Sequence, residues 1–242
     1  MKTYTVLVIG DKPEEQMELF NCNAKVDKYI KYYINDAKSI YDKTIKTIEL
    51  FLKTNGENER LSSYLDDIKE ITEIEYFSSI TEGLDHDAEG NALDDSNPRG
   101  KWSKFTSGGS FSTPLITIDD KETFQTINGN VNWNKMHLFN EELYSNTWEL
   151  IIDGKEPINE NDIKILSTMK SHKDYLLSFG TKENYIIYNT SYWNYAVIKD
   201  GVWIDMENKN SFEWIKNFYN TFIESLDNNT LLTIYEYNIE DL

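Results

Sequence analysis

Apolar and polar residues follow two different periods along this chain, one typical of strands and one typical of helices. β-Branched and apolar residues fill positions 4–10, and this run predicts a buried strand. A similar run at 231–239 predicts a strand near the other end. Pro13 and the two glutamates after it predict that a helix follows the first strand, because proline fits a first helical turn and carboxylates favour its positive end.

Several longer segments have apolar residues at helical spacing. Between 36 and 53 these residues recur three and four positions apart, and Asn55-Gly56 predicts the end of that helix. A second helix is expected directly after it, another near 160–172 and a last one over 211–226. The clearest apolar faces consist of Tyr41, Ile45, Ile48 and Leu52, of Leu61, Tyr64, Leu65, Ile68 and Ile71, and of Phe212, Ile215, Phe218, Tyr219, Phe222 and Ile223.

The remaining apolar runs are shorter. Residues 26–34 fit a strand or the start of a helix, with the strand favoured, and residues 147–153 fit either a strand or a short helix. Gly, Asp, Asn and Pro crowd 83–100 and predict a loop or hairpin. Asp200-Gly201 predicts a hairpin turn. Strands are expected at 111–118, 174–179, 185–190, 195–198 and 202–205.

Together these segments predict an α+β protein in which helices pack on one face of a mainly antiparallel sheet. A length of 242 residues allows a sizeable core, and we expect a single domain over 1–242. The two adjacent helices also suggest a helical subdomain, inserted at about 36–75.

Charge narrows the range of partners. The chain carries 24 basic and 42 acidic residues, a formal net charge of −18. A field of that sign repels phosphate backbones and anionic lipids, so it argues against direct binding of bulk nucleic acid or of a membrane. Two interpretations of the acidity stay open: a solvated surface, or a carboxylate surface that imitates nucleic-acid phosphates and occupies a basic groove on a partner protein.

The N-terminal apolar run is too short for a secretory signal. No run approaches the ~18 apolar residues that a membrane-spanning helix needs. We therefore expect a soluble protein of the cytoplasm, which would be that of a host cell under the first hypothesis below.

Motifs for catalysis or metal binding are incomplete. Cys22 is the single cysteine and is expected to pack as a small apolar residue, with a catalytic thiol as the alternative. Residues 85–91 resemble the opening of a calcium loop, but Ser96 stands where a bidentate glutamate is needed. The histidines are far apart, and acidic pairs such as Glu141-Glu142 fit solvated faces or helix starts. We expect no catalytic residues, no metal and no cofactor.

The segment 97–111 is the main candidate for ligand binding. It combines a turn dipeptide, a basic cluster, three aromatic residues and a Gly-Gly pair within an acidic chain. Its cations and glycine backbone would hold a phosphate while an aromatic ring stacks on a base. The candidate ligand-binding residues are Arg99, Lys101, Trp102, Lys104, Phe105, Gly108 and Gly109. The alternative is a hairpin corner whose Trp102 fills the core.

A second aromatic group lies on or beside adjacent strand candidates. Its members are Tyr192, Trp193, Tyr195 and Trp203. Core packing or cross-strand pairing is the favoured interpretation, and a stacking platform for a base is the alternative.

Three separated stretches together resemble a family of uncharacterised proteins found mainly in bacteriophage genomes. The first is the strand at 4–10 with the glutamates that follow Pro13. The second, 97–109, is similar to the family's Asn-Pro-x-x-Lys-Trp-Asp-Trp-Tyr-x-x-Gly-Gly-Arg-Trp signature. The third runs from the hairpin at 195–203 through a helix to the strand at 226–239. The resemblance covers most of the chain, and it implies no established activity.

Departures from the family pattern bear on function. Ser110-Phe111 replaces Arg-Trp, which removes the guanidinium best suited to hold a carboxylate or phosphate. Residues 204–210 replace a segment similar to Gly-Glu-Met-Gly-Trp-Trp-Gly, and 236–239 replace Asp-Cys-His-Ile. If the missing residues form a site elsewhere in the family, this chain keeps the scaffold without the site, which favours binding over catalysis. If they are structural, their loss carries no information.

Two hypotheses follow from these observations. The first is a non-enzymatic, phage-encoded effector that binds and inhibits a host protein through an acidic surface. Its target would be a nucleic-acid-handling defence factor with a basic groove, which would make the effector an anti-CRISPR or anti-restriction protein. The second is a small-ligand protein that sequesters or hydrolyses a nucleotide signal, with the segment 97–111 as its pocket.

Overall fold

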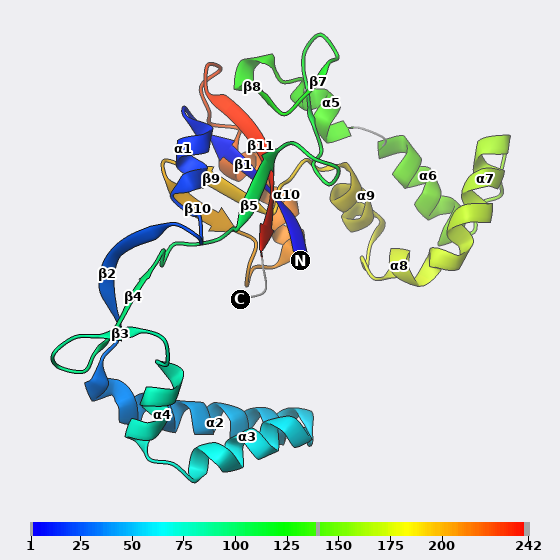
Figure 1. Cartoon of the computed structure of the whole chain (residues 1–242). Coiled ribbons are helices and arrows are strands. Elements are labelled where there is room, and N and C mark those ends of the chain that lie inside the picture. Colours follow the sequence, from blue (N-terminus) through cyan, green and yellow to red (C-terminus); the bar gives the residue numbers. More distant parts are fainter. Residues whose placement is uncertain (1, 139–140, 240–242) are drawn as a thin grey trace. The chain divides into compact units, whose positions relative to one another are not determined.

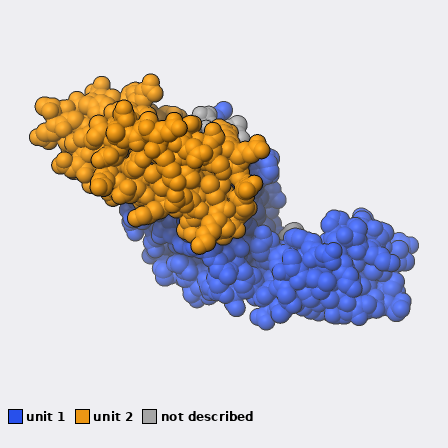
Figure 2. Space-filling view, turned by 90° about the horizontal axis from the view of Figure 1, so that it is seen from below, with its two compact units in different colours: residues 1–22, 99–242 blue, residues 23–98 orange. Residues whose placement is uncertain are grey.

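The chain divides into two compact units. The computed structural model describes residues 2–138 and 141–239 (Figure 1). Residues 1–22 and 99–242 form the first unit, here called the sheet unit, and residues 23–98 form the second, the helical unit (Figure 2). The helical subdomain expected at 36–75 lies inside the helical unit, which begins earlier and ends later.

A mixed sheet forms the centre of the sheet unit. Its strands lie in the order β10-β9-β1-β11-β5, and β8 also pairs with β11 (Figure 1). Among the described strands of this sheet, β1 and β9 form the parallel pair, and the other pairings are antiparallel. The bounds are β1 Lys2–Ile9, β5 Lys104–Ser107, β8 Gln125–Ile127, β9 Ala196–Lys199, β10 Val202–Asp205 and β11 Leu231–Ile239.

The sheet is buried on both faces, which explains why β1 and β9 are continuously apolar instead of alternating. Leu7 and Ile9 face a core built with α10 (Ser211–Phe222), whose buried residues Trp214, Ile215, Phe218 and Phe222 lie on one helix side. Val6 and Val8 face the other core, with Met17 of α1 (Pro13–Glu18), Phe20 and several aromatic rings. The α+β fold expected from the sequence is confirmed, and α1 adds a short helix on the face opposite α10.

Further helices of the sheet unit surround a separate cluster that includes Trp148, Leu176 and Tyr185. These helices are α6 Glu141–Ile151, α7 Glu160–Met169, α8 Lys173–Leu177 and α9 Lys182–Thr190. Another helix, α5 Trp133–Leu138, contributes Met136 to the core built with α10. Two 3-10 turns, η2 Asn128–Asn130 and η3 Lys170–His172, and a short strand pair, β6 Leu115–Ile116 with β7 Glu122–Thr123, complete the unit.

The helical unit combines a small sheet with three helices. Its strands β2 Lys25–Tyr32, β4 Ala92–Ser96 and β3 Asp85–His86 pair in the order β2-β4-β3. Ile48, Leu65, Ile68 and Tyr76 form the core between the helices. After η1 (Ile34–Asp36), the helices are α2 Ala37–Asn55, α3 Glu59–Lys69 and α4 Glu73–Ile80. The calcium-like loop 85–91 is a hairpin turn in which Asp87 accepts from the backbone and side chain of Asn91.

The strands expected at 174–179 and 185–190 are wrong, because α8 and the turn after it occupy the first segment and α9 the second. Thr181 caps α9 by accepting a hydrogen bond from the Asn184 backbone N–H at 3.1 Å. Tyr185 and Tyr188, three positions apart, then lie on the same helix side and both contact Phe179. Helical spacing thus outweighs the β-propensity of these aromatic residues.

For residues 147–153, where a strand or a short helix was expected, the helix is right, since 147–151 belong to α6. Another expectation is corrected. The strand expected over 111–118 is limited to Leu115–Ile116, and Phe111 and Ile118 are 72% and 64% exposed. Among the described residues, no helix is both long and apolar enough to cross a membrane.

Thr72→Ala should destabilise the helical unit. Thr72 and Glu75 form a reciprocal capping box at the start of α4. Loss of the cap is expected to lower the free energy of unfolding by about 1 kcal/mol, measured by urea denaturation. Thr54→Ala is the control, because that hydroxyl only bonds the Leu50 carbonyl within α2. Equal effects of the two variants would contradict the role of the cap.

Candidate functional site

Trp102 of the segment 97–111 lies in the core of the sheet unit. It is 4% exposed, and its indole N–H donates a 3.0 Å hydrogen bond to the Met17 carbonyl. Its ring meets Phe105 edge-on at 4.7 Å between centroids, and Phe105 meets Tyr235 in the same way at 5.0 Å. This is the arrangement expected of a core-filling tryptophan, because no face of the ring is open to a stacking base.

Two cations of the segment, Arg99 and Lys101, have protein partners. Arg99 donates from Nη2 to the Gly201 carbonyl at 2.6 Å, and its guanidinium lies 4.7 Å above the Phe20 ring. Lys101 Nζ is 3.3 Å from Asp205 Oδ2, an oxygen that also accepts from the Trp203 indole N–H. Lys104 is exposed on β5.

Gly108 and Gly109 allow the chain to pass close to two side chains. Their φ angles are +62° and +141°, a region that favours glycine. A Cβ on Gly108 would lie 2.3 Å from the Phe124 ring, and one on Gly109 would lie 2.1 Å from the Glu236 carboxylate. The buried Glu236 accepts a hydrogen bond from the backbone N–H of Phe111. The glycine pair therefore approaches a carboxylate of the chain itself.

The structure thus brings Arg99, Lys101, Trp102 and Phe105 together around the core that includes Phe20, and places Gly108-Gly109 at Glu236. Phosphate binding by this segment stays a prediction. It requires Arg99 and Lys101 to exchange their present partners for a ligand.

Gly109→Ala should destabilise the sheet unit, because the added methyl group collides with the Glu236 carboxylate. We expect a loss of about 1–3 kcal/mol in the free energy of unfolding, as for other overpacked sites. Gly154→Ala is a matched control: its φ is also positive, at +72°, but nothing lies within 4 Å of the added Cβ. A Gly109→Ala variant no less stable in urea than Gly154→Ala would contradict the close approach to Glu236.

A groove between α6 and α7 gathers acidic side chains in the sheet unit. It encloses about 820 Å³ and is lined by the carboxylates of Glu141, Glu142, Glu149 and Asp162 and by one lysine, Lys155. Glu141 and Glu142 stand in the first turn of α6, where the helix dipole favours negative charge. No ion pair is found for these two carboxylates among the residues that the structure describes, so they are available to a partner.

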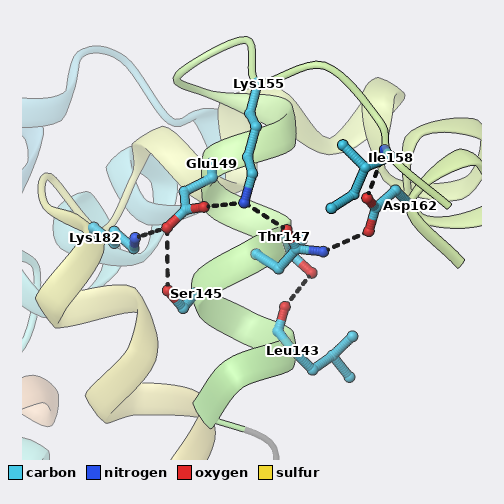
Figure 3. A network of polar contacts seen from close by, with 9 residues as sticks. Leu143, Ser145, Thr147, Glu149, Lys155, Ile158, Asp162 and Lys182 are labelled. Carbon is cyan, nitrogen blue, oxygen red and sulfur yellow. Dashed lines mark hydrogen bonds and ion pairs between the residues drawn. The ribbon is translucent and has the colours of Figure 1, made fainter.

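Polar contacts give the groove a defined shape (Figure 3). Glu149 Oε2 lies 2.7 Å from Lys155 Nζ, and Glu149 Oε1 lies 2.6 Å from Lys182 Nζ at the start of α9. The hydrogen bond from Lys155, followed by that from Lys182, lowers the pKa of Glu149 to about 2. These contacts tie α6 to the loop after it and to α9.

Asp162 fixes the other wall of the groove (Figure 3). It is 2% exposed, accepts from Ile158 N–H at 3.0 Å and accepts from Asn146 Nδ2 at 2.8 Å. The backbone hydrogen bond from Ile158, followed by that from Asn146, lowers the pKa of Asp162. Lys155 Nζ also contacts Asn146 Oδ1 at 3.4 Å, so a single chain of contacts links Asp162 to Glu149.

Apolar side chains accompany the charged ones. Ile158 is 79% exposed at the groove, and Leu143 is also exposed there. Carboxylates beside exposed aliphatic groups can hold a basic side chain by its charge and by its methylene stem. The arrangement therefore fits a protein segment with lysine or arginine better than a small anion.

The sequence contained part of this site. Of the two interpretations of Glu141-Glu142, a solvated face or a helix start, the structure has the helix start. Nothing in the spacing indicated that Glu149 and Asp162 would line one groove with these residues. Asn159, which caps α7 by accepting from Asp162 N–H at 2.9 Å, was the one local signal that could have located the second wall.

Comparison with known proteins provides no family for the chain: no family model, no curated protein and no solved structure matches it. Within 2–138 and 141–239, no group of three His, Cys, Asp or Glu side chains is placed to hold a metal ion. The geometry of the groove is therefore the main guide to function.

Glu149→Gln should change the acid dependence of stability. The pKa of Glu149 falls from 4.5 to about 2 in the folded protein, so its ionised form stabilises the fold above pH 4.5 and this contribution is lost as pH falls to about 2. We expect the variant to melt below wild type at neutral pH, with the difference closing across that window. Glu156→Gln, at an exposed position, is the control. A difference that stays constant with pH would contradict the assignment.

Proposed function

We propose that this chain is a non-enzymatic effector that binds a protein partner through the acidic α6–α7 groove. The groove carries the proposal because it places the carboxylates of Glu141 and Glu142, for which no ion pair is found within 2–138 and 141–239, beside the exposed aliphatic side chain of Ile158. The proposed partner is a basic, nucleic-acid-handling host protein, such as a defence factor, whose phosphate-binding surface the carboxylates would occupy.

The overall charge supports this proposal. A net charge of −18 gives fast, salt-dependent association with a basic surface and repels nucleic acid itself. The resemblance to bacteriophage proteins supports an action on a host component in the cytoplasm. It carries no activity of its own, so the groove remains the physical basis of the proposal.

The order within the groove also supports recognition of a protein. Glu149 is already compensated by Lys155 and Lys182, and Asp162 by backbone and amide donors. These contacts fix α6 and α7 relative to each other, so Glu141 and Glu142 need little reorganisation when a partner binds. Pre-organisation of this kind reduces the entropic cost of association.

A charge-reversal pull-down tests the proposal. The double variant Glu141→Lys/Glu142→Lys and wild type would be used as bait in bacterial lysate at low and high salt, with mass spectrometry of the eluates. We expect wild type to retain a basic nucleic-acid-handling protein that high salt releases, and the variant to lose at least about 90% of it, since paired interface charges contribute strongly to affinity.

Glu57→Lys/Glu59→Lys provides the matched control. These exposed residues flank the N-cap of α3 in the helical unit, so the variant makes the same change in net charge, also at a helix start. The control should retain the partner. Equal loss from both variants would show an effect of net charge alone, and retention by the groove variant would contradict the proposed surface.

A further inference from the structure

A second cavity lies on the α10 face of the sheet, apart from the acidic groove. It has a volume of about 490 Å³, within the range of small-molecule sites. Its lining comes from five stretches of the chain: Thr5 of β1, residues within 111–116, Glu122 of β7, Lys135 and Met136 of α5, and residues 188–193 at and after the end of α9. Segments distant in sequence thus converge on one concavity.

Aromatic side chains contribute much of the lining. Tyr188 and Trp193 have ring centroids 6.4 Å apart, and Phe111 lines the same cavity. Trp193 and Tyr188 are half-buried, whereas Phe111 is 72% exposed. A planar ligand in the cavity would cover rings that otherwise contact water.

The position of Phe111 is built into the fold. Its backbone N–H donates to the buried carboxylate of Glu236, and Glu236 pairs with Thr5 across β1 and β11. Gly109 lies against the same carboxylate, and its φ of +141° turns the chain there. The Gly-Gly pair and Glu236 therefore direct Phe111 to the cavity that Thr5 lines.

The polar groups of the cavity suit an uncharged ligand. Across the described part of the chain, no hydrogen-bond partner is found for the Trp193 indole N–H or for the hydroxyls of Thr113 and Ser191, all in lining residues. The lining cation, Lys135, is paired with Asp120 at 2.9 Å, and Glu122 adds a negative charge. Because the lysine among the described lining residues is paired and these polar groups are open to a ligand, the cavity favours a neutral heteroaromatic molecule over a phosphate ester.

We propose that this cavity binds an uncharged planar heteroaromatic molecule of nucleoside size, stacked on Phe111 and hydrogen-bonded to the polar groups around Trp193. The site is independent of the acidic groove, and it differs from the segment of Arg99 and Lys101. In this proposal, the Gly108-Gly109 turn orients Phe111 toward the ligand.

The test is titration of the full chain with adenosine, guanosine, cytidine and uridine and with their 5′-monophosphates, followed by saturation-transfer NMR and calorimetry. At least one nucleoside should bind with a Kd below about 1 mM, and its monophosphate should bind no more than about threefold more tightly. Absence of binding by all four nucleosides would overturn the proposal. A monophosphate preference beyond that limit would overturn the uncharged class of ligand.

Phe111→Ala locates the bound molecule. This exposed residue can be changed without opening the core, and loss of a stacked ring should weaken nucleoside binding by at least about fivefold. Ile118→Ala, an exposed apolar residue of the same region that does not line the cavity, should bind as wild type does. Melting temperature reports whether each variant is folded. Unchanged affinity of a folded Phe111→Ala variant would overturn the site.

Discussion

The pairing of β1 with β11 on one side and β9 on the other is the constraint on which the sheet unit depends. It joins Lys2–Ile9 to Leu231–Ile239 over eight residue pairs and adds β9 in parallel. Because this central ribbon is buried on both faces, each face needs its own cover. α10 covers one, and α1 with the aromatic residues around Trp102 covers the other.

The segment 97–111 connects these two faces. Trp102 and Phe105 pack with Val6, Val8 and Tyr235, whereas Phe111 lies toward Thr5 and Glu236. Alternate residues of a strand point to opposite faces. In β11, Tyr235 therefore points to the face of Trp102, and the adjacent Glu236 points to the α10 face. The glycine pair makes the crossing possible, since a side chain there would collide with Phe124 or Glu236. Core packing and the direction of Phe111 thus depend on one turn.

The charged side chains fall into two groups, those paired within the fold and those without an ion pair among the described residues. Lysines close to buried or half-buried carboxylates form pairs that hold elements together, as Lys155 and Lys182 do at Glu149 and Lys31 does at Asp94. Acidic residues outnumber basic ones, so not every carboxylate can have a lysine or arginine of its own. Among the described ion pairs, none includes Glu141 or Glu142. As a result, Glu141 and Glu142 lie beside a groove whose sides are held together by ion pairs and hydrogen bonds.

The sequence by itself determined the elements whose apolar period is long or doubly buried: β1, the β9–β10 hairpin, α2, α3, α10 and β11. The spacing of apolar residues is enough to predict these elements, because their apolar faces must be buried whichever element packs against them. It mistook α8 and α9 for strands, since short aromatic runs satisfy both periods and only the cap at Thr181 and the contacts of Tyr185 and Tyr188 favour the helix.

Only the tertiary structure decided the sites. The sequence allowed Trp102 to lie in a ligand pocket or in the core. The side chain is 4% exposed, so it lies in the core. Sequence reasoning grouped Tyr192, Trp193, Tyr195 and Trp203 together, whereas the sheet separates them: Tyr192 and Trp193 pack on the α10 side, and Tyr195 and Trp203 on the other. The physical reason is that a site depends on which faces of distant elements meet. Residue spacing within one segment carries no information about that meeting.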